Sequence, residues 1–325
     1  MNILVCIHSQ FAVWNIPQEH VDRLRAEFPS HTFLHALDDA AALELMGNAD
    51  VAFMGQLTRE QLRAASRLKW IHSPAAGVGG MLFPEMRDSP VVITNSKGMS
   101  AETIAEHVLA VTLAMFRRLP HAFRSQARRE WAQDAIAEQG NRTIAGSRIL
   151  VLGLGNIGRA VARRMTLLGA HVTGIRRAAD RKVDHVAEVA SPDSLLDCLP
   201  HADVVVIAAP HTRETRSLIG AAALAAMSPE AIVVNVSRGA LVDESALAAA
   251  LRDQRIAGAA LDVFEDEPLP ADSPFWTLPN VLITPHTSGF RLDHWDAATA
   301  LFAANLRCFE AGEPLANVVD KQLGY

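Results

Sequence analysis

The segment "SRILVLGLGNIGRAVARRMTLLG" (residues 147–169) decides the fold of this chain. An apolar run leads into Gly153, Gly155 and Gly158 at G-x-G-x-x-G spacing, and apolar residues at helical intervals then continue to Gly169. A strand, a glycine turn and a helix in this order are typical of a parallel α/β unit that binds a dinucleotide. The first glycine permits a tight turn, the second lets the backbone approach a pyrophosphate, and the third lets the helix pack closely on the strand. A glycine turn with a purely structural role is the alternative.

The strand expected next, "HVTGI" (171–175), ends in an unusual way. An acidic residue about 20 positions beyond the first glycine normally accepts a hydrogen bond from the ribose 2′-hydroxyl. Here Arg176 and Arg177 stand at that place, and Asp180 comes after the strand has ended. A guanidinium cannot accept from a hydroxyl, but it can bind a 2′-phosphate with two parallel hydrogen bonds. The sequence therefore predicts NADP(H) as the preferred cofactor, with NAD(H) possible. A solvated arginine pair at a strand end is the alternative.

Near-continuous apolar runs lead into the glycine turn and recur after it. Such runs predict the strands of a parallel sheet covered on both faces. They lie at residues 148–153, 171–175, 203–209, 231–236, 258–263 and 281–285.

A second βα series precedes the glycine turn. Short β-rich runs at residues 2–7, 32–37, 50–55, 68–73 and 91–95 alternate with helical patterns. A long helix is expected from Ser100 to Arg118, with Pro120 as its stop. The fold class is thus predicted to be α/β, with two doubly wound parallel-sheet domains.

Composition limits the function classes. The 325 residues are 50% apolar and 20% charged, which allows about two domains with sizeable cores. The net charge of −6 argues against nucleic acid as a general partner, and no run of about 18 apolar residues predicts a membrane helix. The three scattered cysteines indicate neither disulfides nor a metal site. With no signal peptide expected, the location predicted is the cytoplasm.

Three blocks near the C-terminus carry a family resemblance. They are "NVSRGALVDESAL" (235–247), "ALDVFEDEPLP" (260–270) and "NVLITPHTSG" (280–289). In this order, after the glycine turn, they resemble the signature blocks of the D-isomer-specific 2-hydroxyacid dehydrogenases, which include glyoxylate and hydroxypyruvate reductases.

The resemblance implies an arrangement of domains. A Rossmann dinucleotide-binding domain (99–288) would be inserted into a flavodoxin-like substrate domain (1–98 plus 289–325). It also implies a homodimer, with the long helix and the segment through Trp131 at the interface.

The resemblance further implies three catalytic residues, Arg238, Glu267 and His286, whose chemistry suits the reduction of a 2-keto acid. A guanidinium can hold the substrate carboxylate and polarise the carbonyl. A histidine can deliver the proton, and a neighbouring carboxylate favours its protonated form. The alternatives are a surface arginine, a solvated loop acid and a capped loop histidine.

Other site residues also follow from the resemblance. Substrate would contact Ala76, Gly77, Val78, Arg238 and His286. Besides the two arginines, the cofactor would contact Thr103, Gly153, Gly155, Asn156, Ile157, Gly158, Pro210, His211, Thr215, Val236, Ser237, Asp262, His286, Ser288 and Gly289. His107, on the long helix, is interpreted as a packing residue rather than a catalyst.

These features together predict an oxidoreductase that transfers a hydride from NADPH to a small 2-keto acid, reversibly, giving a D-2-hydroxy acid. Two other functions stay open. One is a dinucleotide-sensing binding protein of the corepressor type, and the other is a formate or phosphite dehydrogenase of the same fold.

Overall fold

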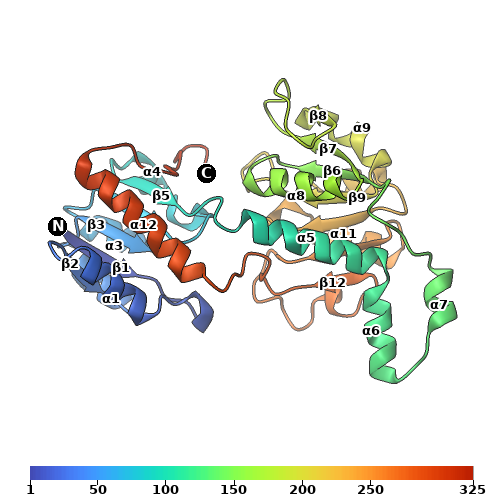
Figure 1. Cartoon of the computed structure of the whole chain (residues 1–325), viewed down its shortest axis with the longest axis horizontal. Coiled ribbons are helices and arrows are strands. Elements are labelled where there is room, and N and C mark those ends of the chain that lie inside the picture. Colours follow the sequence, from blue (N-terminus) through green and yellow to red (C-terminus); the bar gives the residue numbers. More distant parts are fainter. Residues whose placement is uncertain (325) are drawn as a thin grey trace. The chain divides into compact units, whose positions relative to one another are not determined.

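The computed structural model describes residues 1–324, which form two compact units (Figure 1). The first unit combines Met1–Met99 with the chain from Arg291 onward, and the second is Ser100–Phe290. The resemblance implies domain limits after residues 98 and 288, whereas the two units divide after Met99 and Phe290. The first unit is therefore discontinuous in sequence.

The first unit contains a five-stranded parallel sheet in the order β2-β1-β3-β4-β5. This is the flavodoxin-like order, in which the chain winds to one side of β1 and then to the other. The strands are β1 (Asn2–Cys6), β2 (Thr32–His35), β3 (Val51–Met54), β4 (Trp70–Ser73) and β5 (Val92–Asn95).

Helices cover both faces of this sheet. On one face lie α1 (Gln18–Glu27) and α12 (His294–Ala311), and on the other lie α2 (Asp39–Met46), α3 (Arg59–Ala64) and α4 (Pro84–Asp88). The final long helix thus packs on the first sheet, as Figure 1 shows. Its Phe302 ring stacks on Phe53 at 4.5 Å and on Trp70 at 5.4 Å between ring centroids.

The second unit contains a seven-stranded parallel sheet in the order β12-β11-β10-β9-β6-β7-β8. Read from β8, this is the doubly wound Rossmann order with one further strand. The strands are β6 (Arg148–Leu152), β7 (His171–Ile175), β8 (Glu188–Ala190), β9 (Val204–Ile207), β10 (Ile232–Asn235), β11 (Gly258–Leu261) and β12 (Val281–Ile283). The predicted fold class is confirmed. β8 was not predicted, because three residues that include a glutamate give no apolar run.

Two helix layers enclose the second sheet. One contains α5 (Ala101–Phe116) and α8 (Asn156–Leu167); the other contains α9 (Leu195–Cys198), α10 (Ala221–Ala226) and α11 (Glu244–Arg252). Between α5 and α8, Arg164 pairs with Glu102 at 2.6 Å and with Glu106 at 3.1 Å. These ion pairs supplement the apolar contact that holds both helices on the sheet.

The segment after α5 differs from the prediction. α5 ends at Phe116, before Pro120 is reached, and Pro120 lies in the first turn of α6 (Leu119–Arg128). Proline is compatible with that place because the first N–H groups of a helix have no partner within it. With α7 (Gln133–Glu138), α6 extends away from the sheet of this unit (Figure 1). Within residues 1–324, no helix is both long and apolar enough to cross a membrane.

Candidate active site

The glycine turn lies between β6 and α8. Gly153 has φ +95°, and a Cβ there would approach the backbone of Ala209 to 2.7 Å. A Cβ on Gly158 would lie 1.9 Å from the carbonyl oxygen of Gly153, so the third glycine is required for close packing. Gly155 meets nothing within 4 Å and precedes the first residue of α8. The turn therefore leaves open space in front of the N–H groups that begin this helix.

The two arginines follow β7 at the same edge of the sheet. The Gly153 N–H donates to the Ile175 carbonyl at 2.9 Å, which joins the glycine turn to the end of β7. Arg176 is half-buried and Arg177 is exposed. Arg176 and Arg177 therefore lie one and two residues beyond the end of β7, which is hydrogen-bonded to the glycine turn.

The loop after β9 is held by its own side chains. Thr215 Oγ1 donates to the Pro210 carbonyl at 2.6 Å, and His211 is exposed. In the same loop the pKa of Glu214 is lowered by a hydrogen bond from the Thr212 hydroxyl and also by the positive charge of Arg177. That charge effect indicates that this loop and the end of β7 lie within electrostatic range of each other.

Glu267 and His286 form a direct pair. The Nδ1 atom of His286 lies 2.6 Å from Glu267 Oε2. The Phe264 N–H donates to the other carboxylate oxygen at 2.9 Å. Burial raises the pKa of Glu267, but the hydrogen bonds from His286 and Phe264, with the charges of His286 and Arg238, bring this pKa below its usual value. The carboxylate is thus ionised at neutral pH and able to stabilise an imidazolium.

Arg238 follows β10 and lies within electrostatic range of Glu267. Desolvation by the surrounding protein lowers the pKa of the Arg238 guanidinium, and the negative charge of Glu267 opposes this shift. The guanidinium therefore stays charged at neutral pH. Its Nη1 atom donates to the Ser237 carbonyl at 2.6 Å, while the residue remains exposed. A Cβ on Gly239 would lie 1.9 Å from the carbonyl carbon of Phe264. Glycine at this position therefore lets the Arg238 loop approach the turn that carries Glu267.

Asp262 binds the turn that carries His286. Its side chain is buried, and its Oδ1 accepts from the Thr287 N–H at 2.9 Å while its Oδ2 accepts from the Ser288 N–H at 3.0 Å. The His286 N–H donates to the Asp262 carbonyl at 2.8 Å, and His286 has φ +53°. Asp262 thus stabilises His286 in a left-handed backbone conformation that few residues other than glycine adopt.

Thr284 bonds to this aspartate, and His107 contacts Thr284 in turn. Thr284 Oγ1 donates to Asp262 Oδ1 at 2.6 Å, and His107 Nε2 lies 3.2 Å from Thr284 Oγ1. His107 lies on α5, and the sequence does not predict its contact with Thr284. No spacing signal links two residues 177 positions apart.

The other predicted cofactor residues of this unit lie in the first turns of helices and in loops that follow strands. Thr103 is in the first turn of α5, and Gly289 faces Ser100 just before that helix. Ser237, which follows the buried Val236, donates from its hydroxyl to the Ala209 carbonyl. Asn156 and Ile157 begin α8.

The predicted substrate loop belongs to the first unit and follows β4. Asn95 Nδ2 donates to the Ala76 carbonyl at 2.6 Å, and the side chain of Val78 is buried. Ala76 and Gly77 are exposed. Within residues 1–324, the N–H groups of Ala76, Gly77 and Val78 donate to no other group, so they are free to bind an anion.

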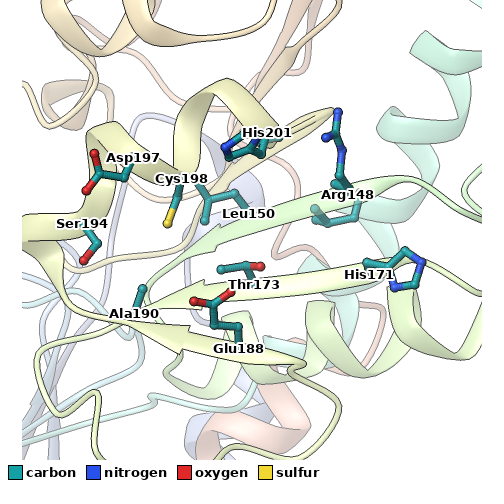
Figure 2. Close-up of a pocket in the computed structure, with 12 residues that line it drawn as sticks. Arg148, Leu150, His171, Thr173, Glu188, Ala190, Ser194, Asp197, Cys198 and His201 are labelled. Atoms are coloured by element: carbon teal, nitrogen blue, oxygen red, sulfur yellow. The ribbon is translucent and has the colours of Figure 1, made fainter.

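A cavity of about 510 Å³ lies elsewhere in the second unit. Figure 2 shows it between β6, β7 and β8 on one side and α9 on the other, with Arg148 and His171 near one end and Ser194 and Asp197 near the other. Arg148, His171 and Glu188 are the first residues of their strands. Residues that begin three strands thus line this cavity, whereas ligands of such sheets bind beyond the carboxyl ends of the strands.

Comparisons with known proteins show which proteins this chain is similar to. Residues 109–288 match the family model described as D-isomer specific 2-hydroxyacid dehydrogenase, NAD binding domain. The chain is 33% identical to glyoxylate/hydroxypyruvate reductase B of Pectobacterium carotovorum over 93% of its own length and 96% of that protein. It is 32% identical to D-3-phosphoglycerate dehydrogenase of Methanocaldococcus jannaschii over 86% of its length, but spans only 53% of that relative.

A solved structure extends the likeness to the whole chain. The D-isomer specific 2-hydroxyacid dehydrogenase of Xanthobacter autotrophicus, in complex with NADPH and MES, superposes with a TM-score of 0.84. The two chains are 32% identical, and 99% of each is covered.

Proposed function

Because the chain belongs to the D-isomer specific 2-hydroxyacid dehydrogenase family, we propose that it reduces a small 2-keto acid to a D-2-hydroxy acid with NADPH as hydride donor. The observation that carries this proposal is the 2.6 Å contact between His286 and Glu267, within electrostatic range of Arg238. An acid and a cation are the two groups that carbonyl reduction requires from the protein.

The glycine turn fits a dinucleotide. Gly155 leaves space where any side chain would obstruct a phosphate, and α8 presents its first N–H groups there. When bound, the nicotinamide cofactor supplies the hydride. In this proposal Gly153–Gly158 bind its pyrophosphate and Asp262 orients its carboxamide end.

Side chains of the protein stabilise the negative charge on the substrate and supply the proton. Arg238 binds the substrate carboxylate and polarises the carbonyl, which reduces the cost of negative charge on the oxygen. His286 then gives its proton to that oxygen, and Glu267 stabilises the imidazolium beforehand and keeps the ring oriented. We propose separately that the free N–H groups of the Ala76–Val78 loop are an anion-binding site of the first unit.

NADPH preference is proposed from Arg176 and Arg177. Neither position offers a carboxylate for a ribose hydroxyl, and both guanidinium groups can bind a 2′-phosphate. The NADPH complex of the Xanthobacter relative supports this choice for a protein of the same family.

We also propose a cytoplasmic homodimer. On and beside the α6–α7 arm (residues 119–138), Phe123 is 61% exposed and Trp131 is 92% exposed. Aromatic side chains this open are common where a second chain covers them. The three cysteines are unpaired, which suits a reducing compartment.

The test of the reaction is a substrate panel. Glyoxylate, hydroxypyruvate, pyruvate and branched 2-keto acids are assayed with NADPH and with NADH, and formate is assayed with the oxidised cofactors. The product's configuration is determined by chiral chromatography. We expect turnover of at least one keto acid to the D-product. We expect His286→Ala to lower kcat by about 10²- to 10⁴-fold, the usual contribution of a general acid, with NADPH binding retained.

Two outcomes would contradict the proposal. If no keto acid is turned over while NADPH still binds, the chain acts as a dinucleotide-binding protein instead. If formate is oxidised and keto acids are not reduced, the reaction belongs to another branch of the fold.

A further inference from the structure

His107 and Thr284 extend the hydrogen-bond network of the active site into α5. Neither residue is among those that the resemblance assigns a catalytic or binding role. His107 lies in the middle of α5, and Thr284 directly follows β12. The two meet at 3.2 Å between His107 Nε2 and Thr284 Oγ1.

The direction of each hydrogen bond follows from counting hydrogens. Asp262 Oδ1 and Oδ2 accept from the backbone N–H groups of Thr287 and Ser288, so both carboxylate oxygens act as acceptors. The Thr284 hydroxyl donates its single hydrogen to Oδ1 at 2.6 Å. Thr284 Oγ1 then has only lone pairs to offer His107, so His107 Nε2 carries a hydrogen and donates it.

This direction does not depend on the charge of His107. Burial lowers the pKa of His107, and the Asp262 charge opposes that shift, so the ring is neutral at neutral pH. In the neutral ring the hydrogen lies on Nε2, and in the protonated ring Nε2 carries one as well. The contact therefore has one polarity in both states.

The hydrogen bonds from His107 through Thr284 to Asp262, here called the relay, end at the backbone that carries His286, the proposed proton donor. Asp262 binds the N–H groups of the two residues after His286, and its own carbonyl accepts from the His286 N–H. His286 is in the left-handed region, with φ +53°. Rotation of the Asp262 carboxylate would release this turn, and Thr284 is the side-chain donor that opposes such rotation.

We propose that His107 and Thr284 are positioning residues that fix the Asp262 carboxylate, and through it the turn that presents His286 to Glu267 and to substrate. The catalytic part of this inference rests on the proposed function, in which His286 is the proton donor. The relay itself is a statement about hydrogen bonds within the second unit and can be measured without substrate.

The test compares substitutions that differ only in donor capacity. Thr284→Val removes the hydroxyl and keeps the shape, whereas Thr284→Ser keeps the hydroxyl. Similarly, His107→Phe removes the donor, and His107→Gln supplies an amide N–H at a comparable reach. Amide hydrogen exchange over residues 284–290 reads the turn directly, and steady-state kinetics read kcat and KM separately.

We expect Thr284→Val to accelerate exchange over 284–290 and to lower kcat by about 10-fold, the effect of losing one hydrogen bond to a charged group. His107→Phe loses a hydrogen bond to a neutral hydroxyl, so it should change both readouts in the same direction and lower kcat by roughly 2- to 10-fold. The KM for the keto acid should change less than 3-fold, and Thr284→Ser and His107→Gln should restore both readouts. A melting temperature close to that of the wild type in all four variants separates positioning from general destabilisation.

The inference is overturned if the Val and Ser variants behave alike, or if exchange over 284–290 is unchanged in Thr284→Val. A wild-type protein that reduces no keto acid contradicts the proposed function alone. In that case faster exchange in Thr284→Val, restored in Thr284→Ser, still supports the relay, and unchanged exchange refutes it.

Discussion

His286 has a backbone conformation that costs a non-glycine residue about 1–3 kcal/mol. Three hydrogen bonds to Asp262 offset this cost, two to its carboxylate and one to its carbonyl. One buried aspartate therefore fixes the backbone from which the imidazole extends. Glu267 then orients the ring through its contact with Nδ1.

Arg176 and Arg177 provide the sharpest prediction at this scale. Replacing both with Ala should raise the KM for NADPH by about 10- to 150-fold, because charge-assisted hydrogen bonds contribute roughly 1.5–3 kcal/mol. The KM for NADH should change less than 2-fold, since NADH has no 2′-phosphate. Initial-rate measurements with both cofactors check this.

Arg181→Ala is the matched control, because Arg181 is an exposed arginine of the same loop. It should leave both KM values unchanged. Equal catalytic efficiency of the wild-type protein with NADPH and NADH would contradict the assigned role of the pair.

At this scale the sequence predicts residues whose type is tied to backbone geometry. Gly153 and Gly158 were predicted as required glycines, and the space around each leaves no room for a Cβ. The sequence does not predict the contact between His107 and Thr284. That contact depends on how α5 lies against β12, which no local pattern in the sequence encodes.

Among the secondary-structure elements, the α6–α7 arm is the least expected from sequence. Arg118 and Arg129, at either end of α6, are both in left-handed conformations. Such conformations are normally signalled by glycine or asparagine, so arginines there give no boundary signal. The apolar strands β6, β9 and β10 were predicted because burial on both faces leaves an unbroken pattern.

The arm also carries a prediction. Changing Phe123 and Trp131 together to Ser should convert the proposed dimer into a monomer, because these side chains offer the largest exposed apolar area of the segment. Light scattering should give twice the chain mass of 35.1 kDa for the wild type and one chain mass for the variant.

Trp276→Ser is the control, because Trp276 is 52% exposed but lies outside the arm. It should remain dimeric. A monomeric wild-type protein with full activity would show that the arm has another role.

At the scale of the whole molecule, acidic pH should lower the free energy of unfolding of the first unit because of His72. This histidine is fully buried in β4, and burial lowers its pKa to about 3. In the unfolded chain it takes up a proton near pH 6.5, but in the folded chain it does so only near pH 3. The unfolded state therefore binds more protons between these values, and stability falls as the pH drops from 6.5 toward 3.

Between pH 6.5 and pH 5 the loss from His72 should be about 2 kcal/mol. Urea unfolding at both pH values, in wild type and in His72→Asn, isolates this contribution. Asparagine can still accept from the Thr94 hydroxyl, which lies 2.7 Å from His72 Nδ1, but it does not titrate. Equal pH dependence in the two proteins would contradict the assignment.

The stacking of Phe302 on Phe53 and Trp70 has a consequence for synthesis. Trp70, on the face of the first sheet that α1 and α12 cover, emerges from the ribosome roughly 230 residues before Phe302 of α12. At about 5–20 residues per second, that face waits on the order of 10–45 s for its cover. The second unit is contiguous and can fold during this delay, so the nascent first unit is the stretch that a chaperone would most need to shield from aggregation.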